Sequence, residues 1–293
     1  MPTRSDSASP QQIGPYRIRR LLGRGAVGAV YLAVDEQQGQ PVALKTLSLG
    51  QEFTGGDFAE ARARFLDEAE IAKRLIHPDI VEVYAADEQR GVAWMAMQLV
   101  PGCTLQRYTH ASRLLPVGLV LGFTERLARA VAHAHAQGVI HRDIKPGNVM
   151  LNLPTGQLKL TDFGIAGLAD MSRTRTGVVL GTPLYMAPEQ LGGASADARG
   201  DLYSLGVVAF QLLSGRLPHE ASSLGELLRQ VARDPAPDLL RFRPDLPPRV
   251  AAVVARALQK QPAARHADAL QLADALAAER SQGRAHGKAR CAP

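Results

Sequence analysis

The segment 139–151, VIHRDIKPGNVML, concentrates side chains capable of chemistry in one short stretch. Between two apolar ends it holds a histidine, two cations, a carboxylate and an amide: His141, Arg142, Lys145, Asp143 and Asn148. A buried strand would not carry so many polar groups, and a solvated loop would not need apolar flanks. The pattern therefore predicts a polar loop held against a hydrophobic core, with a carboxylate base and cations side by side.

A glycine-rich segment, LLGRGAVGAVYLA, is a second candidate for binding phosphate. Gly23, Gly25 and Gly28 have the spacing G-x-G-x-x-G, which alone is a weak signal. In a dinucleotide-binding fold this pattern joins a strand to a helix, but the residues after Gly28 favour a strand. We therefore expect a strand–glycine loop–strand hairpin, whose backbone N–H groups would close over phosphates. An ordinary glycine-rich turn is the simpler alternative.

Lys45, in the segment PVALK, lies on a predicted strand. Alternation places Ala43 and Lys45 on one face of that strand, and Val42 and Leu44 on the other. A single lysine on a strand usually marks a solvated edge. An inward lysine would instead need an anion, either a phosphate or a carboxylate.

The predicted helix over residues 57–76, with Asp57 as N-cap, offers that carboxylate. Glu68 falls on an apolar stripe of this helix, whereas Glu70 shares a face with Lys73 at helical spacing for an exposed ion pair. The other members of the stripe are Phe65, Ala72 and Leu75. Glu68 is therefore the natural partner for Lys45.

Composition excludes several classes of protein. The chain has 293 residues, 46% hydrophobic and 21% charged, with a net charge of +6 and a pI of about 9.6. No basic run is interleaved with aromatic residues, so we expect no nucleic acid partner. The two cysteines, Cys103 and Cys291, are too few for a disulfide framework or a cysteine-based zinc site. Without a signal peptide or an apolar run of about 18 residues, we expect a cytoplasmic protein with no membrane span.

The pattern of elements changes near residue 100. Short strands and one helix dominate from Tyr16 to Val100, and long Ala/Leu-rich helical patterns follow. The polar residues 1–14 read as a disordered tail, and residues 280–293 read as a loose tail because they lack apolar residues. No internal repeat is evident.

Three further motifs follow in order: HRDIKPGN in the opening segment, DFG at 162–164 and APE at 187–189. Together with the glycine loop, Lys45 and Glu68, this ordered set resembles the protein kinase family over about Tyr16 to Leu276. DIKPGN and GTPLYMAPE look like the Ser/Thr branch, and the glycine loop and RFLDEA…LIHPDIV are similar to eukaryotic-like Ser/Thr kinases of bacteria.

The resemblance implies an α+β, two-lobed protein-kinase-like fold. A small β-rich N-lobe with one key helix would occupy about residues 15–97, and a larger α-helical C-lobe about 103–279, with a hinge at about 98–102. The kinase domain as a whole would span 15–279.

The resemblance also assigns catalytic roles. Asp143 would accept the proton of the substrate hydroxyl, and Lys145 would balance charge on the γ-phosphate of ATP. Asn148 and Asp162 would hold Mg²⁺, with Mn²⁺ as an alternative metal. Lys45, oriented by Glu68, would bind the α- and β-phosphates.

The implied nucleotide site combines the glycine loop with apolar walls and the backbone of the hinge. Its full set is Leu22, Gly23, Arg24, Gly25, Ala26, Val27, Gly28, Val30, Ala43, Lys45, Met97, Gln98, Val100 and Met150. In it Val30 and Ala43 would form the roof over adenine, and Met150 the floor.

Other residues would brace the lobes. By the resemblance, Asp201 caps backbone amides of the catalytic loop, Glu189 pairs with Arg265, and His141 packs near Phe163. His133 and His135 lie at i and i+2 on a predicted helix and point apart, so we read them as structural or solvated.

The segment between Gly164 and Ala187 resembles an activation loop. Thr174 and Thr176 are the candidates for autophosphorylation, because a phosphate there could pair with Arg142 and order the loop. Thr182 would contact Asp143. A solvated Thr/Arg loop is the alternative, and self-association would allow phosphorylation in trans.

The sequence thus predicts a non-specific Ser/Thr protein kinase acting in signal transduction, with Mg-ATP and protein Ser/Thr hydroxyls as substrates. A pseudokinase or nucleotide-binding scaffold is the main alternative, and a kinase of small molecules is the second.

Overall fold

The computed structural model describes residues 12–25, 28–47, 55–89, 91–163, 183–191 and 197–289. The chain divides into two compact units. The N-terminal unit comprises Met1–Arg74 and Glu82–Val100, and the C-terminal unit comprises Leu75–Val81 and Pro101–Pro293. Among the described helices, none is both long and apolar enough to cross a membrane.

The N-terminal unit is built on a six-stranded antiparallel sheet with the strand order β1-β2-β3-β4-β6-β5. Polar and glycine-containing turns such as EQQG separate strands whose residues alternate between the two faces. The strands are β1 (Gln12–Ile13), β2 (Tyr16–Gly25), β3 (Gly28–Asp35), β4 (Pro41–Leu47), β5 (Val83–Gln89) and β6 (Val92–Gln98).

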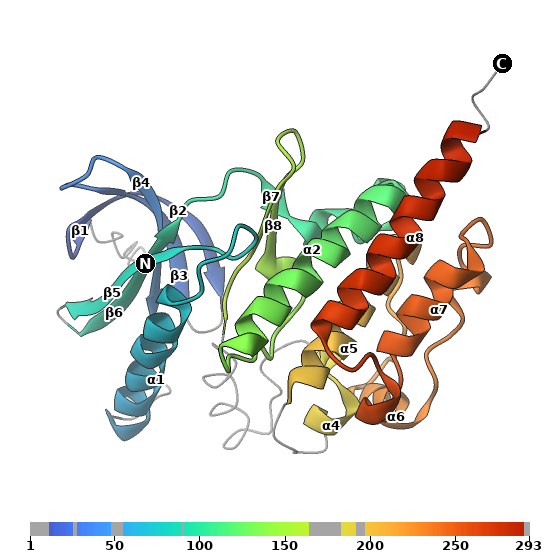
Figure 1. Ribbon diagram of the computed structural model, residues 1–293. Helices are drawn as coiled ribbons and strands as arrows, with labels where there is room; N and C mark the ends of the chain where they lie inside the picture. The colour runs from blue at the N-terminus through green and yellow to red at the C-terminus, as the bar shows by residue number, and fades with distance from the viewer. Residues whose placement is uncertain are drawn as a thin grey trace, which may run out of the picture. The chain divides into compact units, whose positions relative to one another are not determined.

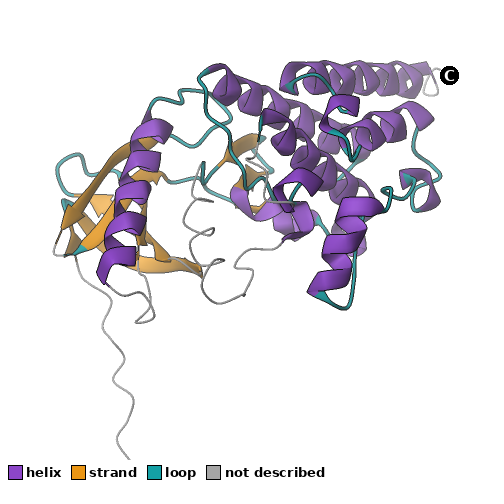
Figure 2. Ribbon diagram, turned by 90° about the horizontal axis from the view of Figure 1, so that it is seen from below, coloured by secondary structure: helices purple, strands orange, loops and turns teal. Residues whose placement is uncertain are grey.

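Helix α1 (Gly55–Lys73) packs against β5 and β6, and Figure 2 shows it lying along the sheet. The helix starts two residues before Asp57, so the predicted N-cap role of this residue is wrong. The helix ends at Lys73, earlier than the predicted end at residue 76.

The C-terminal unit is mainly helical, with a small three-stranded sheet of order β7-β8-β9. Its strands are β7 (Cys103–Thr104), β8 (Val149–Asn152) and β9 (Gln157–Leu160), and its short 3-10 helices are η1 (Leu105–Tyr108), η2 (Ala111–Arg113), η3 (Pro146–Asn148), η4 (Pro183–Tyr185), η5 (Leu239–Arg241) and η6 (Pro262–Ala264). Its α-helices are α2 (Val117–Ala136), α4 (Pro188–Leu191), α5 (Ala198–Ser214), α6 (Leu224–Arg233), α7 (Pro248–Ala257) and α8 (Ala269–Ala289).

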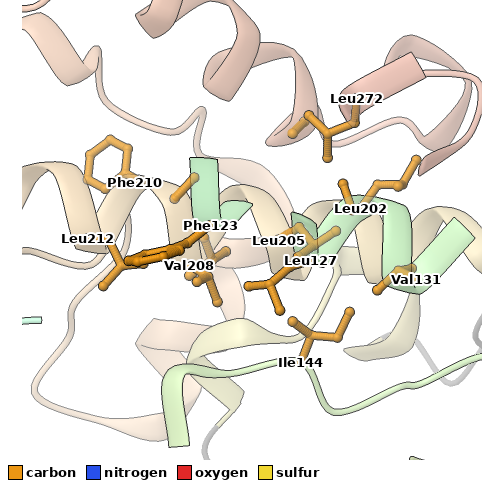
Figure 3. Close-up of a cluster of buried hydrophobic side chains, with 14 of the residues drawn as sticks. Phe123, Leu127, Val131, Ile144, Leu202, Leu205, Val208, Phe210, Leu212 and Leu272 are labelled. Carbon is orange, nitrogen blue, oxygen red and sulfur yellow. The ribbon is translucent and has the colours of Figure 1, made fainter. Parts of the chain in front are cut away.

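Helix α5 is the centre of this unit, because every residue from Gly200 to Ser214 is buried. Helices α2 and α8 run side by side (Figure 1). Ile144, from the catalytic segment, belongs to the same hydrophobic cluster as Leu127 of α2 and Leu205 of α5 (Figure 3). The polar loop is therefore anchored in the core, as its apolar flanks predicted.

The segment 75–81 leaves the N-terminal unit and belongs to the C-terminal unit. Ile80 forms a parallel bridge with Leu160, and the Val81 N–H donates to the Leu160 carbonyl at 2.9 Å. Asp79, which is buried, forms an ion pair with Arg126 of α2. The predicted single boundary at the hinge does not account for the assignment of residues 75–81 to the C-terminal unit.

Both ends of the described chain differ from the predicted tails. Ile13 is buried and pairs with Tyr16, so the folded part begins by Gln12 and not at residue 15. Helix α8 continues to Ala289, where a loose tail was expected from residue 280. Arg280 of this helix forms an ion pair with the buried Glu125 of α2 at 2.8 Å, a long-range contact that the local sequence does not show.

Candidate active site

Asp201, near the start of α5, holds the backbone at the head of the catalytic segment. Its carboxylate accepts hydrogen bonds from the N–H groups of His141 at 2.9 Å and Arg142 at 2.8 Å. Arg142 has a φ of 67°, a left-handed conformation that costs about 1–3 kcal/mol in a non-glycine residue. The buried carboxylate stabilises this turn, so the predicted capping role of Asp201 is confirmed.

His135 has a structural role that sequence reasoning did not specify. Its Nε2 lies 2.8 Å from an Asp201 carboxylate oxygen, so helix α2 also fixes the capping residue. His133, two residues earlier, instead contacts the side chain of Gln137 at 2.8 Å. The i, i+2 spacing indicated that the two rings diverge, but only the fold reveals which one faces Asp201.

His141 is completely buried and both of its ring nitrogens are engaged. Nε2 lies 3.0 Å from the Thr161 carbonyl, and Nδ1 accepts the Asp143 N–H at 3.2 Å. The ring packs on Phe163 with a centroid distance of 4.6 Å. The prediction that His141 is a packing residue is confirmed, and its engaged nitrogens make it unsuited to act as a base.

Asp143 is a half-buried carboxylate with two side-chain partners. Lys145 Nζ donates to Asp143 Oδ2 at 2.7 Å, and Asn148 Nδ2 donates to the same oxygen at 3.0 Å. Asn148 Nδ2 also donates to the Asp143 backbone carbonyl at 2.8 Å. Three of the predicted site residues therefore meet, and the carboxylate is fixed in orientation.

Asn148 directly precedes β8 and Asp162 lies two residues after β9, so the pairing of these strands brings the two segments together. β8 and β9 pair with Val149 opposite Leu160, and the Thr161 N–H donates to the Asn148 carbonyl at 2.9 Å. Asp162 has a φ of 61°, which turns the chain sharply after the strand.

The donor set at this point suits a hard divalent cation. Because the amide nitrogen of Asn148 donates twice to Asp143, its amide oxygen is directed away from that residue. This oxygen and the Asp162 carboxylate are the oxygen ligands that Mg²⁺ prefers. The residues present therefore fit the metal that the sequence motifs imply.

In the N-terminal unit, four predicted nucleotide-binding residues share one face of the sheet. Val30 pairs with Lys45, and Ala43 pairs with Met97, in adjacent rows of β3, β4 and β6. Since residues two apart on a strand share a face, these side chains gather on one side. The opposite face forms a separate hydrophobic cluster that contains Val42 and Leu44, which confirms the predicted alternation.

The choice between the two carboxylates of α1 is supported by burial. Glu70 is exposed and pairs with Lys73 at 2.9 Å, as its spacing predicted. Glu68 is half-buried, and one of its carboxylate oxygens is inaccessible to solvent. The stripe that contains Glu68 is confirmed, and its pairing with Lys45 stays a prediction.

The glycine-rich segment forms a hairpin between β2 and β3, with Gly25 opposite Gly28. This arrangement rules out the strand-to-helix alternative. A Cβ at Gly28 would overlap the Thr46 carbonyl oxygen, whereas a Cβ at Gly23 would meet no atom of the described residues within 4 Å. Leu22 and Arg24 are exposed, and the predicted residues Ala26 and Val27 lie outside the described residues.

The residues predicted to contact adenine from the hinge lie at the end of β6 and beyond it. The Gln98 N–H already donates to the Glu82 carbonyl at 2.8 Å, so an adenine contact must use other backbone groups. Val100 is buried. In the C-terminal unit, the half-buried Met150 pairs with Thr104 across β7 and β8.

The predicted pairing of Glu189 with Arg265 is confirmed. The two guanidinium nitrogens lie 2.6 and 2.7 Å from the two carboxylate oxygens, and Arg265 is buried. The guanidinium also lies over the ring of Tyr203, 5.1 Å from its centroid. This bidentate contact ties the start of α4 to the loop before α8.

The activation-loop candidates Thr174 and Thr176, and also Thr182, lie outside the described residues. Arg142 is exposed beside Asp143, and among the described residues it forms no ion pair.

Comparison with known proteins gives a consistent result. The protein kinase domain family matches residues 16–277. The chain is similar to the serine/threonine-protein kinase PknA of Mycobacterium tuberculosis, with 39% identity over 92% of this chain and 62% of the relative. It is also similar to PrkC of Bacillus subtilis, with 36% identity over 85% of this chain and 38% of that protein. The chain therefore spans between about two fifths and three fifths of the length of these curated relatives.

The fold is similar to that of a solved kinase domain. The crystal structure of the Mycobacterium tuberculosis PknI kinase domain matches with a TM-score of 0.73 and 35% identity, over 93% of this chain and 100% of that one. A structure of Rad53 in complex with AMP-PNP, 24% identical, matches with a TM-score of 0.73 over 89% of this chain and 64% of that chain, and supports the fold alone.

Proposed function

Because this chain belongs to the protein kinase family, we propose that it transfers the γ-phosphoryl group of Mg-ATP to Ser/Thr hydroxyls of protein substrates. The observation that carries this proposal is the geometry of Asp143. Its carboxylate is held by Lys145 and Asn148, on a segment whose backbone is fixed by Asp201. A carboxylate held in this way can accept a hydroxyl proton and direct the oxygen toward a phosphoryl group.

Lys145 has a second role in this proposal. Its ammonium group lies beside the base, where it would balance negative charge on the γ-phosphate while the hydroxyl attacks. In the N-terminal unit, Lys45 would bind the α- and β-phosphates, oriented by Glu68. Val30, Ala43 and Met97 of the same unit would contact adenine through apolar surface.

Asn148 and Asp162 would hold Mg²⁺ through their side-chain oxygens. When bound, the ion would neutralise charge on the phosphates. The chain's own contribution is to position these residues. The Asn148 amide is held by its two bonds to Asp143, and Asp162 lies in a sharp turn two residues after β9. Asp162→Ala should therefore remove metal-dependent transfer, and substantial remaining activity would reject this residue as a metal ligand.

The test is phosphate transfer from labelled ATP to a protein substrate, with Asp143→Asn as the decisive variant. We expect turnover to fall by roughly 10²–10⁴, the usual contribution of a general base. Asp197→Asn is a matched control, because Asp197 is an exposed helix-capping carboxylate on the same unit. ATP binding without transfer by the unaltered chain would favour the pseudokinase alternative. Transfer only to small molecules would favour a small-molecule kinase.

We further propose that autophosphorylation at Thr174 or Thr176 activates the enzyme. The support is Arg142, a solvent-exposed cation next to the catalytic base whose backbone Asp201 fixes. A phosphate of roughly −1.5 to −2 charge could form charge-assisted hydrogen bonds with it. Phosphatase-treated enzyme should recover activity after a lag with ATP, and a Thr174→Ala/Thr176→Ala variant should not. Full activity with both threonines unmodified would reject this mechanism.

Self-association would let one copy phosphorylate another. The rate of autophosphorylation should then rise with enzyme concentration, whereas a rate per molecule independent of concentration would indicate reaction within one copy.

A further inference from the structure

Segment 75–81 is held on α2 and β9 by a cluster of polar groups that the proposed reaction does not use. Its buried carboxylate, Asp79, is bound by Arg126 of α2, whose Nε lies 3.1 and 3.2 Å from the two carboxylate oxygens. Lys159 of β9 donates from Nζ to the Ile80 carbonyl at 3.0 Å. The segment is therefore fixed by charged side chains from two other elements of the C-terminal unit.

His77 stabilises the turn within this segment. The Asp79 N–H donates to His77 Nδ1 at 3.0 Å, and the Ile80 N–H donates to the His77 carbonyl at 3.1 Å. A backbone N–H can only donate, so Nδ1 must be the unprotonated nitrogen, and the neutral ring carries its proton on Nε2. In an imidazolium both nitrogens are donors, and this contact would be lost. The turn therefore has this form only while His77 is neutral.

The surroundings of His77 oppose a positive charge on its ring. The ring faces that of His133 of α2, with a centroid distance of 5.3 Å. Arg126 of α2 and Lys159 of β9 are two cations that act on it. Among the described residues that face His77, Asp79 alone is negative, and it already binds Arg126. A proton on His77 would add a third cation to a cluster with one carboxylate.

We propose that His77 is an acid-sensitive latch for segment 75–81. While the ring is neutral, it accepts the Asp79 N–H, and the segment stays docked on α2 and β9. A proton at Nδ1 breaks this hydrogen bond and leaves the N–H of the buried Asp79 without its acceptor. The turn then opens, and the segment loosens from the rest of the C-terminal unit. Because the segment follows α1 directly, this change would loosen the chain at the end of the helix that carries Glu68.

Proton linkage gives the direction of the response. Burial lowers the pKa of His77 below its ordinary value of 6.5. The charges of His133, Lys159 and Arg126 lower this pKa further, and the carboxylate of Asp79 opposes them. The loosened segment therefore binds the proton more readily than the docked one. The latch is fully closed above pH 6.5 and opens as the pH falls through the lower pKa of the docked ring.

The experiment follows the ¹⁵N-labelled full chain by NMR from pH 7.5 to pH 5, without ATP or metal, so its outcome does not depend on kinase activity. We expect the neutral His77 ring to be protonated on Nε2, and the Asp79 amide signal to titrate together with the ring. The Val81 amide, which bonds to β9, should lose hydrogen-exchange protection severalfold over this range, by at most about tenfold per pH unit. The amide of Val207 in the buried helix α5 reports global unfolding, and its protection should fall less.

Two variants sharpen the test. His77→Asn supplies an amide oxygen that can accept the Asp79 N–H without titrating, so Val81 should then lose no more protection than Val207. His133→Gln removes the facing ring and should raise the midpoint of His77 toward 6.5, and it serves if the asparagine variant does not fold. The proposal is overturned if the neutral His77 ring is protonated on Nδ1, or if Val81 loses no more protection than Val207 in the unaltered chain. An unchanged pH response in His77→Asn would also overturn it.

Discussion

The catalytic segment of the C-terminal unit and the glycine hairpin of the N-terminal unit have different roles in one proposed reaction. The first would supply the base and the second would bind phosphates, and they are built in opposite ways. Around Asp143, side chains from α2, α5 and the end of η3 converge through hydrogen bonds. At the tip of the β2–β3 hairpin, by contrast, the described residues from Arg19 to Gly25 are exposed.

The difference reflects what each region must provide. A base must keep one orientation, so its neighbours are fixed by buried polar contacts whose loss is costly. A loop that closes over phosphates needs accessible N–H groups and little side-chain volume, so it gains from open space. Gly28 is the exception in the hairpin, because the backbone of β4 passes directly beside it.

The largest effect that this comparison predicts is at Asp201. Asp201→Asn replaces one acceptor oxygen with a donor that would face a backbone N–H, and the left-handed turn at Arg142 loses support. We expect turnover to fall about 100-fold, the scale of a misplaced catalytic group. The exposed Asp197→Asn change should alter turnover less than about twofold. Equal effects of the two substitutions would show that the hydrogen bonds of Asp201 have no special role in holding the catalytic segment.

Within the hairpin, Gly28→Ala and Gly23→Ala should separate packing from openness. The added Cβ at Gly28 would overlap the Thr46 carbonyl, so unfolding free energy should fall by about 1–3 kcal/mol. At Gly23 it meets no atom within 4 Å in the described part of the chain, so the change should stay within about 0.5 kcal/mol. Chemical denaturation measures both values, and a matching loss at Gly23 would show that the hairpin tip is packed.

On α1, Glu68→Ala should lower activity about tenfold, because Lys45 would lose its proposed orienting partner. Glu70→Ala is the matched control on the exposed face, where its pair with Lys73 should contribute less than about 1 kcal/mol. Steady-state kinetics at saturating ATP measures the difference. A silent Glu68 and a damaging Glu70 would mean that the apolar stripe identified the wrong carboxylate.

The smallest effect concerns pH and His219, far along the chain from both regions. Its pKa is lowered by burial to about 4 in the folded protein, from 6.5 in the unfolded chain. The unfolded state therefore binds more protons, and the stability contributed by neutral His219, present above pH 6.5, is lost as pH falls toward 4. His219→Gln should lose less stability between pH 7 and pH 5 than the unaltered chain. An equal loss, measured by denaturant titration, would place the pH dependence elsewhere.

Much of the site was predictable because its signals are local. Asp143, Lys145 and Asn148 lie within six residues, so short motifs and the known constraints of phosphoryl transfer suffice to group them. The stripe through Glu68 follows from helical periodicity alone.

The parts that were missed depend on contacts between distant segments. β1 is too short to show alternation, and its strand character comes from pairing with β2. The continuation of α8 beyond residue 279 is stabilised by Arg280 and Glu125, which are far apart in sequence. His135 gave no signal that distinguishes it from His133, since only the position of α5 determines which ring meets Asp201.

Because segment 75–81 belongs to the C-terminal unit, it determines how the chain could be divided into two fragments. Since it lies between α1 and β5 yet contacts β9 through Ile80, a cut after Val100 would leave the first fragment carrying a segment of the C-terminal unit. Ile80 and the buried Asp79 would then act as a built-in recognition element, with Leu160 and Arg126 as its complement on the second fragment. Two separately produced pieces divided at this point should reassemble, in the manner of a split reporter. A first fragment that also lacked residues 75–81 should reassemble less well, because it would lack Ile80 and Asp79.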